Sequence, residues 1–234
     1  MKKILLLFAF LISLSTFGQE YIISENVQAD TTDTDFGPNQ KHYWHSYISY
    51  GFIAPVSNQP EVVEAFKSGE TLLGIRYKRK FTELLSGGID LFYLNRRFAI
   101  NQSNKQFWID TAVYHKEKLN LQNVSAALFF RINTARRGNI IGKYLDIGGY
   151  GLYALGIKRT IEDKIPFSPW GETSFKNTIK GGNYLNRFNY GVFARIGLNF
   201  FVLNFRYRLS QLIIHNQIPE FPRFSFGIEL DILD

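Results

Sequence analysis

The chain has 234 residues, no cysteine and a formal net charge of +7. The absence of cysteine excludes a disulfide scaffold, a thiolate metal site and a lipoprotein anchor. The positive charge is spread along the sequence instead of being clustered, which argues against a nucleic-acid-binding surface.

The N-terminus has the pattern of a secretory signal peptide. Lys2 and Lys3 precede an apolar run over residues 4–14, and Thr16 and Gly18 are small residues at the usual positions before a cleavage site. The apolar run is too short for a membrane span, which needs roughly 20 residues. We therefore expect a signal peptide over residues 1–18, with a retained anchor as the alternative. Residues 19–42 are acidic and polar, and we expect them to form a flexible periplasmic lead.

Eight segments alternate with the period of two that is typical of half-buried strands. In the clearest one, Phe188, Tyr190 and Val192 share one face, and Asn189 and Gly191 lie on the other. The segments cover approximately residues 43–54, 70–80, 86–97, 119–132, 144–157, 188–200, 203–210 and 224–232. The fifth is the least regular, because glycines and apolar residues fall on both faces. No apolar stretch is long enough for a transmembrane helix, so membrane insertion would have to use strands.

The connections between these segments alternate between long and short. In order, they cover residues 55–69, 81–85, 98–118, 133–143, 158–183, 199–202 and 210–222. Outer-membrane barrels have long extracellular loops and short periplasmic turns. The sequence therefore predicts an all-β fold, an eight-stranded antiparallel up-and-down transmembrane β-barrel over residues 43–234, located in the outer membrane. Within the first long loop, Pro60 to Lys67 is expected to form a short helix that ends before Gly69.

The composition of the two faces predicts which one points outward. The non-apolar face is rich in small residues with a few charges, which suits a narrow interior filled by side chains better than a surface in water. An Arg or Lys in the lipid-facing midplane would cost roughly 2–4 kcal/mol. We therefore expect a luminal charge network made of Arg76, Lys78, Asp90, Arg131, Asp146, Arg195, Arg206, Arg208, Glu229 and Asp231.

Several of these charges are expected to pair across hairpins. Lys78 and Asp90 are equally distant from a turn near Leu84, as are Arg131 and Asp146 from a turn near Gly138. Arg206 and Arg208 have Glu229 and Asp231 available on the following strand. We expect a structural role for the network, because buried charges persist when they are paired. A proton or ion path is the alternative.

Aromatic residues near the strand ends are expected to form an aromatic girdle at the two membrane interfaces. A ligand-binding aromatic cluster is the alternative. The girdle is predicted to contain Tyr43, Trp44, Tyr47, Tyr144, Phe200 and Phe201 on the periplasmic side and Tyr184 and Phe188 on the outer side.

The loop from Lys158 to Asn183 is a candidate partner loop, because loops on a rigid scaffold often carry function. It could contact lipopolysaccharide phosphates or meet another envelope protein through its aromatic residues. A structured cap without function is the alternative. The candidate residues are Lys158, Arg159, Lys164, Phe167 and Trp170.

The sequence indicates no catalytic, cofactor-binding or metal-binding residues. His42 and His45 would lie on opposite faces of a strand, which argues against a shared metal. His115 and His215 fall in or beside long loops, and nothing in the sequence joins Ser210 to His215 as a catalytic pair. The glycines at 148, 149 and 151 lie in a strand with no following helix, so they cannot form a phosphate loop.

The chain resembles the small single-domain outer-membrane barrels of Bacteroidetes-type bacteria. The resemblance rests on features such as Tyr47-Ile48-Ser49-Tyr50-Gly51-Phe52, which opens the barrel, and Phe224-Ser225-Phe226-Gly227-Ile228-Glu229-Leu230, which closes it. Within that group the chain looks similar to the PorT-like barrels, and this resemblance implies a connection with protein secretion and gliding.

These observations favour a non-enzymatic barrel that anchors or assists an envelope complex. The expected partners are outer-membrane lipid, lipopolysaccharide and other envelope proteins, with no nucleic acid and no cofactor. The alternatives are an enzyme that modifies outer-membrane lipids through His115 or His215, and a narrow pore. The pore is the weaker of the two, because eight strands leave an interior filled by side chains.

Overall fold

A computed structural model describes residues 38, 40–54, 62–64, 66–103, 112–134, 142–165, 173–214 and 219–232. The expected signal peptide and nearly all of the acidic lead lie outside this part of the chain. Nine strands are formed: β1 (His42–Ala54), β2 (Gly69–Lys80), β3 (Leu85–Ala99), β4 (Lys116–Asn133), β5 (Lys143–Lys164), β6 (Ser174–Lys180), β7 (Phe188–Leu198), β8 (Phe201–Arg208) and β9 (Phe224–Ile232).

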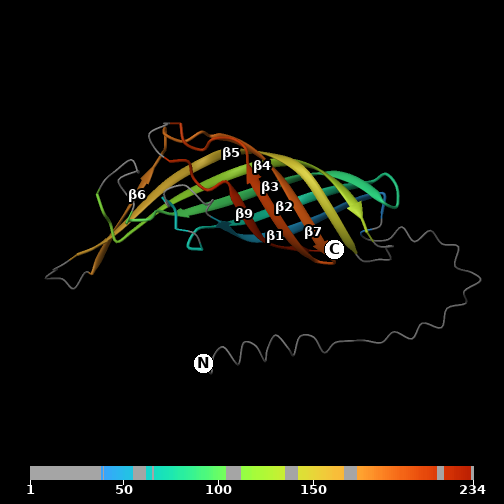
Figure 1. The fold of residues 1–234 in the computed structure, drawn as a ribbon, viewed down its shortest axis with the longest axis horizontal. Helices are drawn as coiled ribbons and strands as arrows, with labels where there is room; N and C mark the ends of the chain where they lie inside the picture. Colours follow the sequence, from blue (N-terminus) through green and yellow to red (C-terminus); the bar gives the residue numbers. More distant parts are fainter. Residues whose placement is uncertain are drawn as a thin grey trace, which may run out of the picture. The chain divides into compact units, whose positions relative to one another are not determined.

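Eight of these strands close into an antiparallel barrel (Figure 1). The sheet runs in the order β4-β3-β2-β1-β9-β8-β7-β5, and a further pairing of β4 with β5 closes it. The predicted eight-stranded antiparallel barrel is thus confirmed. The remaining strand, β6, is not part of the closed barrel. It pairs with the end of β5, from Lys158↔Lys180 to Lys164↔Ser174.

The hairpin of β5 and β6 was not predicted. β5 continues to Lys164 and β4 begins at Lys116, both well beyond the expected bounds. The sequence signal fails there because residues 158–164 carry no apolar alternation. The strand is instead maintained by pairing with β4 on one side and β6 on the other.

The predicted helix over Pro60–Lys67 is also wrong. Of its described residues, Val63 forms an antiparallel bridge to Ile100, and Phe66 lies in a turn with a φ of 58°. No described residue is α-helical. The described part of the chain therefore contains no helix long and apolar enough to cross a bilayer.

A register shift explains the irregular fifth segment. Gln122 of β4 pairs with Gly156, but the next residue, Asn123, pairs with Ala154, so Leu155 of β5 is an extra residue in the wall. A bulge of this kind reverses the in-and-out alternation beyond it. Ala154 is buried before the bulge and Ile157 is buried after it, whereas Leu155 is exposed.

The two ends of the barrel differ. The strand ends that short connections join, at residues 80 and 85, 133 and 143, and 198 and 201, lie at one end of the barrel. The strand ends that long connections join lie at the other end, here called the mouth. Both ends of the barrel segment lie at the short-connection end, because Ile232 pairs with Ser46 near the start of β1.

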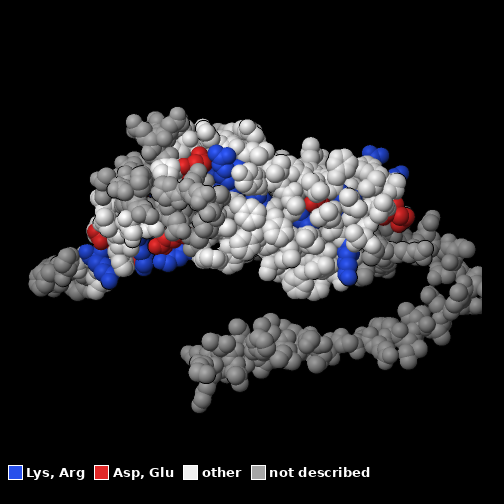
Figure 2. Space-filling view, in the orientation of Figure 1, with Lys and Arg blue, Asp and Glu red and all other residues white. Residues whose placement is uncertain are grey.

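The outer wall carries a broad apolar belt, and most of its middle is uncharged in Figure 2. Its members are large apolar side chains that are 40–65% exposed. They include Ile48, Leu73, Ile75, Ile89, Leu91, Val124, Leu128, Ile147, Tyr153, Leu155, Val192, Ile196, Leu203, Tyr207, Ile228 and Leu230.

The barrel interior is filled by side chains in successive layers. An aromatic and aliphatic layer contains Tyr47, Leu72, Phe92, Leu94, Ala127, Phe129, Tyr150, Leu152 and Phe193. The mouth is filled by a second cluster, here called the apolar cap, made of Ile53, Val62, Val63, Phe98, Ile100, Leu119, Leu121, Ala154, Ile157, Leu185, Leu212, Ile213 and Phe221. Long-loop residues thus fold inward over the end of the barrel.

Interior glycines make room for the aromatic rings. A Cβ at Gly74 would lie 2.7 Å from the ring of Tyr47 and from Cβ of Phe92. A Cβ at Gly148 would lie 2.6 Å from the ring of Phe193. Close packing of the interior rings therefore depends on glycine at both positions.

Candidate functional site

The charged interior centres on Arg76, which is fully buried. Its guanidinium donates to Asp90 Oδ1 through Nε at 2.8 Å and to Glu229 Oε1 through Nη2 at 2.6 Å, and its Nη1 lies 3.5 Å from Asp231 Oδ1. The three carboxylates come from β3 and β9, on opposite sides of β2 in the sheet order. Arg76 therefore joins two strands, β3 and β9, that do not pair with each other.

Two further arginines extend this network. Arg195 Nη1 donates to Asp90 at 2.5 Å and its Nη2 lies 3.1 Å from Asp146. Arg131 contacts both oxygens of Asp146, at 2.7 and 2.9 Å. Such a two-point guanidinium–carboxylate contact is a strong and directional hydrogen-bonded pair. The ring of Tyr144 lies 3.5 Å from the Arg131 guanidinium carbon and covers it.

A second cluster lies nearer the mouth and centres on Glu70. Arg206 donates to Glu70 Oε1 at 2.5 Å, Arg96 donates to Oε2 at 2.8 Å, and the Ser225 hydroxyl donates to Oε1 at 2.9 Å. Glu70 and Arg96 were missed in the sequence prediction. Strand parity would have found both, because even-numbered residues of β2 and β3 point inward, as Arg76 and Asp90 do.

All ten residues of the predicted luminal network are buried in the barrel. Their pairing differs from the prediction in two places. The first is Lys78, which does not pair with Asp90. The register places Arg76 opposite Asp90 and Lys78 opposite Gly88, because the turn is centred one residue earlier than expected. Lys78 donates instead to the carbonyl of Pro38.

The second difference concerns Arg206 and Arg208. Neither pairs with Glu229 or Asp231, because β8 meets β9 with Arg206 opposite Ser225. Arg208 donates to Glu220 at 2.7 Å and to the carbonyl of Phe221 at 3.0 Å. It thereby fixes the 209–223 connection against the end of β8. Such a contact could not be predicted from the sequence, because a loop has no strand register that would place Glu220 beside Arg208.

The predicted aromatic girdle is wrong for half of its members. Tyr43, Tyr47 and Tyr144 point inward and are at most 7% exposed, and Tyr184 packs against the apolar cap. Burial raises the pKa of the Tyr184 phenol. The parity of the strands decides this, since Tyr43 and Tyr47 share the inward face with His45. The remaining members, Trp44, Phe188, Phe200 and Phe201, are exposed on the outside.

The candidate partner loop is partly the β5–β6 hairpin. Its residues Lys158, Arg159 and Lys164 belong to β5. Arg159 points inward and donates to Glu117 at 2.5 Å, whereas Lys158 and Lys164 face outward. Phe167 and Trp170 lie outside the described residues.

The described histidines are separated by the barrel wall. His42 is exposed and lies 2.6 Å from the Tyr77 hydroxyl, and His45 is buried 3.5 Å from Asp231. His115 is exposed just before β4, and His215 lies outside the described residues. Ser210 donates to Asn189 Oδ1 at 2.9 Å. Among the residues that the structure describes, no group of three or more His, Asp or Glu side chains could hold a metal ion.

One strand shows how the wall changes along the barrel axis. On β4 the outward residues are Val124, Ala126, Leu128, Phe130 and Ile132 over the belt, but Lys116, Lys118, Asn120 and Gln122 near the mouth. The inward residues are mixed at both levels. Arg131, Phe129 and Ala127 lie behind the belt, and Glu117, Leu119 and Leu121 lie behind the polar end. Only the outward face of the strand therefore changes in polarity, between Gln122 and Val124.

No protein-family model, curated protein or solved structure matches the chain. The site is therefore interpreted from its own chemistry. In the larger cluster three guanidinium groups face four carboxylates, with His45 beside Asp231. This near-balance of charge is what a packed interior requires to keep ions out of water.

Proposed function

We propose that the chain is an exported outer-membrane barrel that serves as a non-enzymatic anchor or accessory subunit of an envelope complex, for example in protein secretion. The change from polar to apolar side chains along the outward face of β4 carries this proposal. A barrel in water has no reason to expose Val124 to Ile132 on one strand, whereas a lipid-facing band explains both this run and its end at Gln122.

The dimensions of the belt support membrane insertion. At ~3.4 Å per residue, the run from Val124 to Ile132 is about 27 Å long. A strand tilt of 35–45° gives it a height of about 20 Å, close to the ~25 Å apolar band of outer-membrane barrels. In an unpaired state, the charges behind the belt would be costly in lipid, and the ion pairs described above offset that cost.

The packed interior favours an anchor over a pore. Two charge clusters, an aromatic layer and the apolar cap fill the lumen at successive levels. The hairpin of β5 and β6 favours contact with a partner, since every side chain of β6 is exposed. The outer edge of β6 pairs with no described strand, and a free edge of this kind can accept another strand.

Cysteine labelling tests the membrane part of the proposal directly, because the chain has no native cysteine. Thr178→Cys lies on β6 beyond the mouth, and Thr82→Cys lies in a short connection at the opposite end, and both threonines are exposed. In intact cells we expect a membrane-impermeant maleimide to label the first variant alone. Labelling of both variants, or of Thr82→Cys alone, would contradict the proposed orientation.

Site-specific crosslinking tests the accessory role. A photoreactive residue at Phe175 or Ile179, which are 48% and 44% exposed on β6, should give an adduct of the same mass at both positions in native membranes. The control position is Leu84, which is 57% exposed at the opposite end and should not give that adduct. If neither β6 position gives a discrete adduct, the hairpin is not a partner surface.

A further inference from the structure

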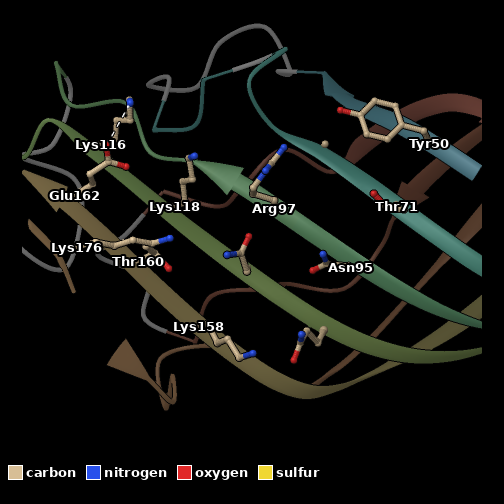
Figure 3. Close-up of a pocket in the computed structure, with 13 residues that line it drawn as sticks. Tyr50, Thr71, Asn95, Arg97, Lys116, Lys118, Lys158, Thr160, Glu162 and Lys176 are labelled. Carbon is tan, nitrogen blue, oxygen red and sulfur yellow. Dashed lines mark hydrogen bonds and ion pairs between the residues drawn. The ribbon is translucent and has the colours of Figure 1, made fainter. Parts of the chain in front are cut away.

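A polar groove lies on the outer wall beside the mouth (Figure 3). It has a volume of about 390 Å³ and is formed by the outward faces of β2, β3, β4 and β5, with Tyr50 of β1 and Lys176 of β6 at its sides. It lies directly beyond the apolar belt. On β4 the groove residue Gln122 precedes the exposed Val124, and on β5 the exposed Leu155 precedes the groove residue Lys158.

The groove is strongly basic. Five cations line it, with Glu162 as the single carboxylate. Lys116 lies 3.5 Å from Glu162, as the dashed line in Figure 3 marks. Arg97, Lys118, Lys158 and Lys176 make no ion pair with any residue in the described ranges. Among the described residues, these four positive charges therefore face one surface without a carboxylate at ion-pair distance, which is unfavourable unless an anion is bound or the solvent screens them.

Neutral hydrogen-bonding groups alternate with these cations. The register places Asn120 between Arg97 and Lys158, and places Thr160 opposite Lys118. Neighbouring strands are ~4.8 Å apart, so Arg97 and Lys158 are separated by about 10 Å across Asn120. A ligand here can bind anionic groups at two points and hydroxyl groups between them. This is the chemistry of a phosphorylated sugar.

The position of the groove favours a lipid-linked sugar over a soluble one. A soluble sugar phosphate would make no contact with the apolar belt, whereas a lipid whose headgroup lies in the groove would place its acyl chains along Val124 and Leu155. Basic side chains at the edge of a membrane bind anionic headgroups in this way. The rest of the belt's rim differs, since the outward faces of β7 and β9 are aromatic at the mouth, at Phe188 and Phe224.

We propose that this groove binds the phosphorylated sugar headgroup of an outer-leaflet glycolipid. The proposal rests on the membrane insertion proposed above, but not on a protein partner. Arg97, Lys118 and Lys158 contact the phosphate groups, and Asn120 and Thr160 contact the sugar hydroxyls. The bound lipid covers β3 to β5 and leaves β7 to β9 free.

Binding of lipid A by the full mature chain in phosphatidylcholine bicelles tests the inference. The double variant Lys118→Gln/Lys158→Gln should weaken binding by about 25-fold, since each Lys or Arg near an anionic membrane surface contributes about 1 kcal/mol, or about fivefold. Lys118→Arg/Lys158→Arg should retain the affinity. The matched control, Arg79→Gln/Lys143→Gln, removes two exposed cations at the opposite end and should leave it unchanged.

Four outcomes would overturn the inference. Equal weakening by the control would indicate general charge attraction, and unchanged binding by dephosphorylated lipid A would exclude phosphate recognition. Competition by inorganic phosphate at the same concentration as lipid A would identify a site for a free anion. Correct cysteine labelling with no lipid A binding would refute the groove while leaving the membrane proposal intact, and incorrect labelling would refute the membrane proposal itself.

Discussion

The outward faces of β4 and β5 change in polarity along the same continuous strands. Over the belt the outward side chains are apolar, as with Leu128, and near the mouth they are charged or polar, as with Lys118. The inward faces mix both kinds of side chain, with Arg131 and Phe129 behind the belt and Glu117 and Leu119 near the mouth. Strand structure is thus independent of the polarity of the outward face, and the surroundings of each part select its outward side chains.

The comparison also separates two ways of filling a barrel. Behind the belt, the narrow interior contains arginines and carboxylates that neutralise one another across the lumen. At the mouth, the interior contains the apolar cap, supplied partly by the long loops. The cap is stabilised by burial of apolar surface, as the core of a soluble protein is. The ion network is stable only if each of its buried charges has a partner of opposite charge.

The largest effect is expected from breaking the ion network. Arg76→Met leaves Asp90, Glu229 and Asp231 buried without their shared cation, which should cost about 3–5 kcal/mol of unfolding free energy. Urea titration of the barrel in lipid vesicles measures this cost. The control is Glu83→Gln, which breaks an exposed pair with Lys80 and should cost about 0–1 kcal/mol. A loss below about 1 kcal/mol for Arg76→Met would mean that the network contributes little to stability.

An intermediate effect is expected from placing a charge on the belt. Leu128→Arg puts a guanidinium on the apolar belt, which our proposal places in lipid, and should cost about 2–4 kcal/mol in the same titration. Asn120→Arg changes an outward residue of the same strand beyond the belt, and should cost at most about 1 kcal/mol. Equal costs at the two positions would place the membrane boundary elsewhere and remove the main support for insertion.

The smallest effect compares two isoleucines of β5. Ile157→Val removes one methylene from the apolar cap and should cost about 0.5–1.5 kcal/mol. Ile147→Val makes the same change on the outward face, where lipid can fill the space, and should be nearly neutral. If the order is reversed, the cap is not a packed core.

Much of the barrel could be predicted from residue order alone. The period of two, the alternating connection lengths and the small or charged face predicted eight strands and the direction of their faces. The same parity, applied to Glu70, Arg96 and Tyr47, would have extended the ion network and corrected the girdle. The error in the girdle came from grouping aromatic residues by type instead of by strand face.

What the sequence could not determine depends on register and on contacts between distant segments. Asp90 pairs with Arg76 because of the position of one turn, and Arg208 pairs with Glu220 because a loop folds inward. The groove joins residues of the six strands β1 to β6, and no local sequence pattern predicted the β5–β6 hairpin. The sequence specifies which face of a strand is apolar because that is a property of neighbouring residues, whereas only closure of the sheet decides which charges meet across it.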